Sequence, residues 1–240
     1  MFIEQYYSEE NQRVSFTRQQ ASDFAKEIAD DFNPIHNVDA KRFCVPGDLL
    51  FSIILAKSGL NSKMTFNFSG MVTDTVALAF PTEVAESAQV LDENGKEYMN
   101  YAVSGEHSKC TTLIDSLIRS YVEFSGHTFP QILGHLMEKN NVMINPARPM
   151  IMYQSMEIDL DTLDLTEVSL QLNEQETILT VDGKRGQAKL KFDLLSNGKV
   201  VGHGIKYMVL SALREYCSEK MSEVNTRFYA IKDEYYANKN

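Results

Sequence analysis

The sequence predicts an α+β protein in which two units, each a helix followed by an antiparallel meander of strands, precede a C-terminal helix. Three observations support this class. Hydrophobic residues recur with helical spacing up to about residue 58 and switch to the two-residue period of strands after Asn61. The same order of helices and strands returns in the second half of the chain. Asn-Gly pairs at 94–95 and 197–198 lie between strand-like runs, as is typical of β-hairpin turns.

Composition and charge limit the class of protein further. Of the 240 residues, 43% are hydrophobic and 23% are charged, which excludes a disordered or collagen-like chain. The formal net charge of −10 argues against a non-specific nucleic-acid binder, because phosphate contacts need a basic face. The apolar run Leu49–Ala56 is far shorter than the ~20 residues of a membrane span, and the N-terminus does not resemble a signal peptide. We therefore expect a soluble, cytoplasmic protein without a membrane span.

The first half is expected to begin with an amphipathic helix. Thr17 and Gln20 form a capping box, and the apolar residues that follow recur at helical spacing. This helix should run to about Asp30, because the Asn-Pro pair at 33–34 forces the preceding backbone out of the helical region. A second, buried helix should begin near Gly47 and contain the run LLFSIILAKSGL.

Strands are expected at short runs in which apolar residues alternate with polar ones or follow one another. In the first half these runs are Met64–Phe68, Val76–Phe80, Gln89–Leu91 and Lys96–Val103. The second half begins with helices expected at Leu113–Phe124 and Pro130–Lys139. The strands expected after them are Met150–Leu160, Val168–Leu172, Ile178–Val181, Ala188–Leu195 and Lys199–Leu210.

Several features recur at a fixed offset, and this recurrence favours an internal duplication. The offset between the two Asn-Gly-Lys turns is 103 residues (197 − 94 = 103). The matched features are these turns, the pairs Thr75-Val76 and Ile178-Leu179 and, within one residue, the strands at 64–68 and 168–172.

We expect a first unit over residues 1–110, a second over 111–210 and a C-terminal helix over 211–240. Apolar side chains in the last part recur at alternating spacings of four and three residues, at Cys217, Met221, Val224, Phe228, Ile231 and Tyr235. This stripe indicates a helix packed on its own chain or, alternatively, a contact between subunits.

The segment most informative about function precedes the buried helix. Its pattern Asp31-x-Asn33-Pro34-x-His36 resembles the hydratase motif of MaoC-like dehydratases and (R)-specific enoyl-CoA hydratases. Those proteins have the hot-dog fold, in which an antiparallel sheet wraps around a long helix. The detailed resemblance covers about residues 24–60. Together with the repeated order of helix and meander, it implies a double hot-dog fold.

The resemblance also implies catalytic roles for Asp31 and His36, with Asn33 orienting a water. Hydrating an α,β-unsaturated thioester requires a base that deprotonates the water attacking C3 and an acid that protonates C2, and a carboxylate and an imidazole can share these roles. The enolate oxygen needs a hydrogen-bond donor, which by resemblance is the backbone N–H of Gly47. We expect a lyase of fatty acid metabolism that acts on a thioester of coenzyme A or a carrier protein, with no metal and no further cofactor.

Some features depart from the family pattern. Only eleven positions separate His36 from Gly47 (47 − 36 = 11), so we expect an open acyl pocket. Asp48 lies beside the expected oxyanion and substrate-binding position, where a like charge is unfavourable, and Asp30 adds another negative charge beside the motif. The alternatives are a catalytically inactive hot-dog module that binds an acyl chain or a protein, and an acyl-CoA thioesterase in which Asp31 activates water.

The remaining candidates are weaker. The basic cluster Lys184, Arg185, Lys189 and Lys191 suits the phosphates of a coenzyme A or carrier-protein arm, although a solvated hairpin is the simpler interpretation. The cysteines are expected to be reduced packing residues, and the histidines other than His36 to be structural. Because hot-dog units work in pairs, a chain with two copies is expected to be a monomeric pseudo-dimer or a homodimer.

Overall fold

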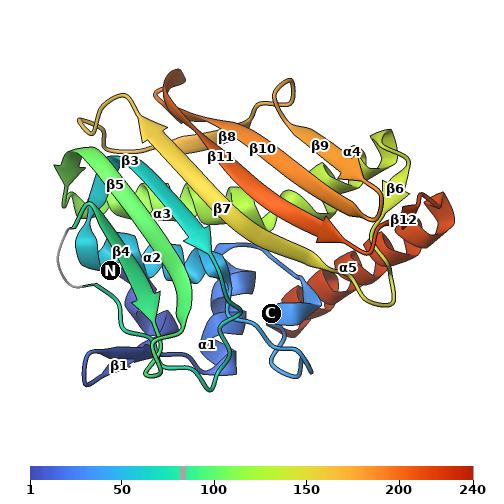
Figure 1. The fold of residues 1–240 in the computed structure, drawn as a ribbon, viewed down its shortest axis with the longest axis horizontal. Helices are drawn as coiled ribbons and strands as arrows, with labels where there is room; N and C mark the ends of the chain where they lie inside the picture. Colours follow the sequence, from blue (N-terminus) through green and yellow to red (C-terminus); the bar gives the residue numbers. More distant parts are fainter. Residues whose placement is uncertain (82–84, 240) are drawn as a thin grey trace.

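The structure is a computed structural model that describes residues 1–81 and 85–239. Within these residues, an antiparallel sheet of eight strands extends across the molecule, and helices α2 and α3 cover one of its faces (Figure 1). The predicted α+β class, with a large antiparallel sheet and a C-terminal helix, is confirmed.

The α-helices are α1 (Arg18–Asp23), α2 (Gly47–Ser58), α3 (Thr111–Gly126), α4 (Leu133–Lys139) and α5 (Ser218–Lys239). Short 3₁₀ or π-helical segments are η1 (Phe2–Tyr6), η2 (Phe24–Ile28), η3 (Pro34–His36) and η4 (Thr128–Ile132). The large sheet contains β3 (Leu60–Phe68), β4 (Ser87–Leu91), β5 (Glu97–Ser108), β7 (Ile151–Leu160), β8 (Ser169–Leu172), β9 (Ile178–Asp182), β10 (Arg185–Ser196) and β11 (Lys199–Ser211). Two separate pairs join β1 (Ser8–Glu10) to β2 (Arg13–Ser15) and β6 (Val142–Met143) to β12 (Arg214–Glu215).

The strand order is approximately symmetric about the centre of the sheet. It runs β4-β5-β3-β7-β11-β10-β8, and β9 also pairs with β10. The two central strands are β3 and β7. Strand β3 pairs with β5, the second strand of the β4–β5 hairpin, and β7 pairs with β11, the second strand of the β10–β11 hairpin. The two inner strands pair with each other antiparallel, with Phe66 opposite Met156. The two halves of the chain therefore form one continuous sheet.

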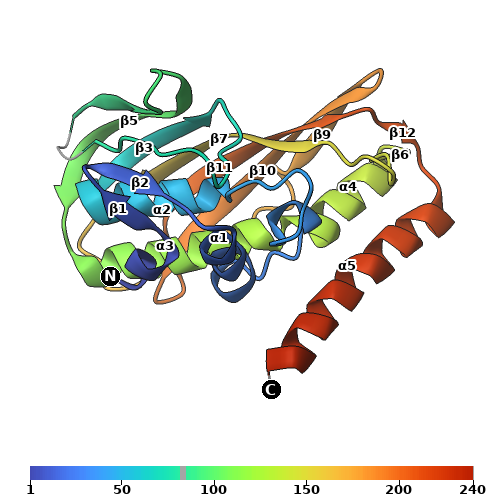
Figure 2. The same cartoon turned by 90° about the horizontal axis from the view of Figure 1, so that it is seen from below.

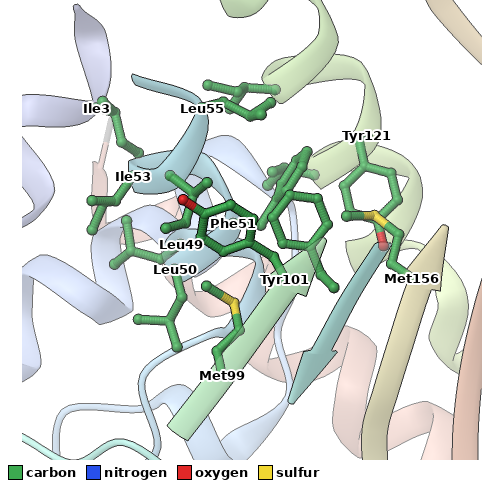
Figure 3. Close-up of a cluster of buried hydrophobic side chains, with 14 of the residues drawn as sticks. Ile3, Leu49, Leu50, Phe51, Ile53, Leu55, Met99, Tyr101, Tyr121 and Met156 are labelled. Carbon is green, nitrogen blue, oxygen red and sulfur yellow. The ribbon is translucent and has the colours of Figure 1, made fainter. Parts of the chain in front are cut away.

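Helix α2 lies against the covered face of this sheet and is largely buried. Leu49, Phe51 and Leu55 are fully buried, and Figure 3 shows them in a cluster of buried side chains that also includes Met99 of β5 and Tyr121 of α3. A helix that is apolar on every side has to be covered on every side. The expectation that the run after Gly47 forms a buried helix is confirmed.

The N-terminal helix also follows its sequence signals. Thr17 Oγ1 accepts a hydrogen bond from the backbone N–H of Gln20 at 3.1 Å, and Gln20 Oε1 accepts one from the N–H of Thr17 at 2.9 Å. Helix α1 continues into η2, whose C-cap is Ala29. Asp30 follows with a φ of +51°, outside the right-handed helical region. The helix end predicted near Asp30 is confirmed.

Two expectations about strands are wrong. The segment Val76–Phe80 forms only isolated bridges, because Leu78 pairs with Val14 of β2 while the next residue pairs with the end of β4. In addition, β8 lies at the sheet edge beside β10, so the strand that takes the place of β3 in the second half is β7. The 103-residue offset thus relates the hairpin turns and not the strands before them. Residues 82–84 of the first predicted unit and residue 240 of the C-terminal segment lie outside the described residues.

Helix α5 packs on its own chain, as one interpretation of its apolar stripe predicted. Met221 and Phe228 are buried, and the ring of Phe228 lies 5.8 Å from that of Phe129 in η4. Figure 2 shows α5 on the side of the helical layer that faces away from the sheet.

The contact between α3 and the end of η2 gives a prediction about packing. A Cβ atom at Gly126 would lie 1.7 Å from the carbonyl oxygen of Ala29, whereas one at Gly134 in α4 would meet nothing within 4 Å. We expect Gly126→Ala to lower the free energy of unfolding by at least about 2 kcal/mol, because the overlap is with backbone. Gly134→Ala should raise it by up to about 1 kcal/mol through helix propensity. Denaturant titration of both variants tests this, and equal stabilities would contradict it.

Candidate functional site

The loop that leaves η2 is shaped by its own side chains. The backbone N–H of Asp31 donates to the carbonyl of Ala25 at 2.8 Å, and Asp31 Oδ1 accepts from the N–H of Asn33 at 2.8 Å. Asn33 Oδ1 in turn accepts from the N–H of Ile35 at 3.2 Å, and Pro34 is the first residue of η3. Such side-chain caps stabilise tight turns. The Asp-x-Asn-Pro part of the motif therefore holds the turn, and Asn33 has a structural role whatever else it does.

This turn brings the carboxylate of Asp31 against the imidazole of His36. Asp31 Oδ2 lies 3.6 Å from His36 Nε2, and His36 Nδ1 lies 2.7 Å from the carbonyl oxygen of Cys44. Because a carbonyl oxygen can only accept, Nδ1 carries a hydrogen and donates it. Neutral His36 then presents the lone pair of Nε2 to a carboxylate. Two acceptors at this separation suit a shared proton or a bridging water.

The pair is accessible from solvent, although it is not fully exposed. The side chain of Asp31 is 25% exposed and that of His36 is 12% exposed. The imidazole is held from one side by the Cys44 carbonyl, so its reactive nitrogen has a defined direction. The arrangement can therefore move a proton to or from a small molecule that reaches the loop.

The N-terminus of α2 follows the loop. Pro46 is its N-cap and Gly47 its first residue. A Cβ atom at Gly47 would lie 3.1 Å from the ring of Phe68 and 3.3 Å from that of Tyr153, and these two rings are 4.3 Å apart. The absence of a side chain thus lets two aromatic rings approach the helix end. The first backbone amides of any helix lack an acceptor within that helix and are available to a ligand.

Asp48, the next residue, belongs to a buried polar cluster. Its Oδ2 accepts a hydrogen bond from Ser125 Oγ at 2.5 Å, and the same Oγ accepts one from Lys206 Nζ at 2.5 Å. Lys206 is only 3% exposed, and its ammonium lies 4.5 Å from the centre of the Tyr153 ring. Within the described residues, Asp48 Oδ1 has no hydrogen-bond partner. A serine hydroxyl therefore bridges a buried acid and a buried base.

The cluster and the motif act on each other electrostatically. Burial raises the pKa of Asp48, and the positive charge of Lys206 opposes that shift. Burial lowers the pKa of Lys206, and the negative charges of Asp48 and Asp31 oppose it. The Asp31 charge also raises the pKa of Asp48, whereas His36 lowers it. The sequence indicated an uncompensated negative charge beside the expected oxyanion position, whereas the structure places a lysine on the other side of the Ser125 hydroxyl.

Most of this cluster was missed by sequence reasoning. One signal for Lys206 exists, because Gly202, Gly204 and Lys206 alternate with more exposed residues along β11 and so face the core. Nothing in the local sequence points to Ser125 or to Tyr121. The Tyr121 hydroxyl is hydrogen-bonded to that of Tyr153, and burial raises the pKa of both well above the usual range, so both rings stay neutral.

Asp30, which the sequence indicated as an extra negative charge beside the motif, has partners of its own. Its Oδ2 accepts hydrogen bonds from Lys232 Nζ and, at 2.8 Å, from His127 Nε2, and its Oδ1 accepts one from the Tyr236 hydroxyl at 3.1 Å. Burial by itself would raise the pKa of Asp30, but the hydrogen bonds from Lys232 and His127 outweigh it and lower the pKa. The carboxylate is thus compensated within the chain.

The predicted phosphate contacts lie apart from this site. Lys184 and Arg185 are exposed at the turn between β9 and β10. Arg185 pairs with Ser211, five residues along β11 from Lys206 (211 − 206 = 5). That spacing corresponds to about 17 Å along a strand. The other two lysines of the basic cluster occupy positions of β10 that face away from the core.

Several further properties bear on possible cofactors and on the cysteines. Across residues 1–81 and 85–239, no group of three or more His, Cys, Asp or Glu side chains is placed to hold a metal ion.

In that same part of the chain, no helix has both the length and the apolar character that a bilayer span requires. The cysteines are free, as expected, but Cys110 is exposed, so the expectation that it is a packing residue is wrong. Burial raises the pKa of Cys44 to about 11, so its thiol stays protonated and unreactive.

The bridged pair of Asp48 and Lys206 gives a prediction about stability. Lys206→Met leaves a buried carboxylate without its cation, so we expect it to lower the free energy of unfolding by about 3–5 kcal/mol. The double variant with Asp48→Asn should cost less than the sum of the single variants by at least about 1 kcal/mol. Denaturant unfolding of the four proteins measures this coupling, with Lys189→Met on the outer face as the control. Strict additivity would show that the pair is not coupled.

Asp30 gives a prediction about pH. Because its folded-state pKa is lowered, its ionised form stabilises the fold above the ordinary value of 3.8, and this contribution is lost as pH falls below that value. We expect Asp30→Asn to lower the melting temperature at about pH 7 and to differ less from the unmodified protein near pH 3. Thermal unfolding across this range tests the expectation, with Asp233→Asn on the exposed side of α5 as the control. A difference that is independent of pH would contradict it.

Comparisons with known proteins place this site within a family. No curated protein matches the chain. It is similar to a crystal structure described as a "putative thioesterase II" from Thermobifida fusca YX, with 8% identity and a TM-score of 0.41 over 70% of this chain and 87% of that one. Residues 1–219 match the family described as "Protein of unknown function (DUF3581)", and this span includes the motif loop, the buried cluster and the whole sheet. The chain belongs to the DUF3581 family.

Proposed function

We propose that the chain adds water to an α,β-unsaturated acyl thioester, or removes it in the reverse direction, with Asp31 and His36 as the acid–base pair. The observation that carries this proposal is the 3.6 Å approach of His36 Nε2 to Asp31 Oδ2, with Nδ1 held by the Cys44 carbonyl. The pair precedes a helix wrapped by an antiparallel sheet. That setting agrees with membership of the MaoC-like hydratases and with a double hot-dog fold, and both are part of the proposal.

The chemistry needs two proton transfers. A water between Asp31 and His36 loses one proton to the pair while its oxygen bonds to C3 of the acyl group. The electrons of the double bond move onto the thioester as an enolate, and a proton from the pair then bonds to C2. One hydroxyl and one hydrogen are thus added, and the pair returns to its starting state. As proposed, the reaction uses no metal and no redox cofactor.

The enolate oxygen would be stabilised at the start of α2. We assign this role to the backbone N–H of Gly47, assisted by the dipole of a twelve-residue helix. Asp48 is then a neighbour of the bound carbonyl and not a ligand of it, because its carboxylate is bonded to Ser125. The positive charge of Lys206 lowers the electrostatic cost of placing a second negative charge at this helix end, relative to what the sequence alone indicated.

The substrate would be a thioester of coenzyme A or of a carrier protein. Lys184 and Arg185 remain candidate phosphate contacts, since the arm of either carrier separates its phosphate from the thioester by a long chain. The continuous sheet across β3 and β7 supports a pseudo-dimer within one chain, although a homodimer fits the proposal too. We propose the cytoplasm as the location of this reaction.

Assays with trans-2-enoyl-CoA substrates of increasing chain length test the proposal, followed by loss of absorbance of the conjugated thioester. We expect Asp31→Asn and His36→Ala each to lower kcat by at least about 100-fold without loss of folding, because each removes a proton-transfer group. Asn33→Ala should cost less, and the exposed His203 provides a matched control in His203→Ala.

Other results would point elsewhere. Release of free thiol that requires Asp31 would indicate a thioesterase. Binding of acyl thioesters without turnover, unaffected by Asp31→Asn, would indicate a non-catalytic acyl-binding module. Absence of both turnover and binding across chain lengths would rule out the proposed activity.

A further inference from the structure

Helix α5 makes contacts that bear on the motif loop. The family match ends at residue 219, so it includes only the first two residues of α5, Ser218 and Glu219. The rest of the helix passes η4, where Phe228 contacts Phe129, and reaches the motif loop, where Tyr235 contacts Phe32. Its polar composition and two buried side chains indicate that it adds little to the main core.

Phe32, the residue between Asp31 and Asn33, is held by rings of α5. Its side chain is fully buried. Its ring lies 6.4 Å from that of Phe228, 5.6 Å from that of Tyr235 and 5.7 Å from that of Tyr236. Tilted and edge-on contacts at these distances stabilise aromatic pairs. The burial of Phe32 therefore depends on a helix about 200 residues later in the chain (228 − 32 = 196).

Asp30, on the other side of Asp31, is held by polar groups of the same helix. It accepts hydrogen bonds from Lys232 Nζ and the Tyr236 hydroxyl, as well as from His127. Its φ of +51° is a conformation that costs a residue with a side chain about 1–2 kcal/mol and persists only when the surroundings hold it. The hydrogen bonds from α5 and from His127 thus hold the side chain of the residue that adopts this conformation.

Asp30 and Phe32, the two neighbours of Asp31 in the sequence, are thus both in contact with α5. Proton transfer depends on a separation of 3.6 Å between Asp31 and His36, and a displacement of about 1 Å can lower a rate by about 100-fold. We propose that α5 is a strap that holds residues 30–36 in the reactive arrangement, with Lys232 and Tyr236 as positioning residues. This inference rests on the proposed acid–base role of Asp31 and His36, and its mechanical part can be measured without it.

The test uses the full chain. Lys232 and Tyr236 line an open cavity of about 540 Å³, so changing them does not empty the core. Lys232→Met and Tyr236→Phe each remove a bond to Asp30 and keep most of the side chain. We expect faster hydrogen–deuterium exchange at residues 30–36 and at least a 10-fold lower kcat with KM changed less than about three-fold. Lys232→Arg should restore most of both properties, and Lys220→Met, an exposed lysine of the same helix, should alter neither.

The outcomes separate the strap from the proposed reaction. Unchanged exchange in Lys232→Met and Tyr236→Phe would overturn the strap, whatever the activity. Faster exchange with unchanged kcat would overturn the positioning role. If the unmodified protein lacks hydratase turnover, the proposed function fails, but faster exchange restored by Lys232→Arg would still support a strap that orders the loop. Faster exchange with lower kcat supports both.

Discussion

The rest of the structure depends on the burial of α2. Apolar side chains occur on every side of this helix, and Leu49, Phe51 and Leu55 are fully buried. The sheet can satisfy that requirement only by covering one side of the helix while α3 and the N-terminal segment cover the others. The first turn of α2 nevertheless contains Asp48, so wrapping the helix also takes a carboxylate out of water. Ser125 donates a hydrogen bond to that carboxylate and accepts one from Lys206, and this compensation matters because a buried charge is strongly destabilising without it.

At the N-terminus of α2, the charged groups of the buried cluster lie close to those of the candidate site. Asp31 and His36 lie close enough to alter the pKa of Asp48, and Lys206 experiences Asp31 as well as Asp48. A change in any of these groups therefore changes the electrostatic potential at the others. The polar cluster that lets the helix be buried thus also sets the conditions under which an anion could form at its N-terminus.

The C-terminal helix connects the loop to a distant part of the chain. Asp30 is bonded to Lys232 and Tyr236, and Phe32 is covered by rings of the same helix. Most of α5 lies beyond the family match, whereas the motif lies inside it. The geometry of the loop is therefore decided jointly by the family region and by a segment outside it.

The sequence by itself determined the features that arise from neighbouring residues. Capping and periodicity located the first two helices, turn chemistry located both hairpins, and the five-residue spacing of Asp31 and His36 within a Pro-containing turn made their proximity predictable. The apolar run Val76–Phe80 was misleading, because a strand also needs a partner of matching length. Only the tertiary structure decided that Ser125 connects Asp48 to Lys206, 158 residues away (206 − 48 = 158). The reason is physical, because this bridge exists only once the register of β11 against β7 brings Lys206 beneath the end of a buried helix.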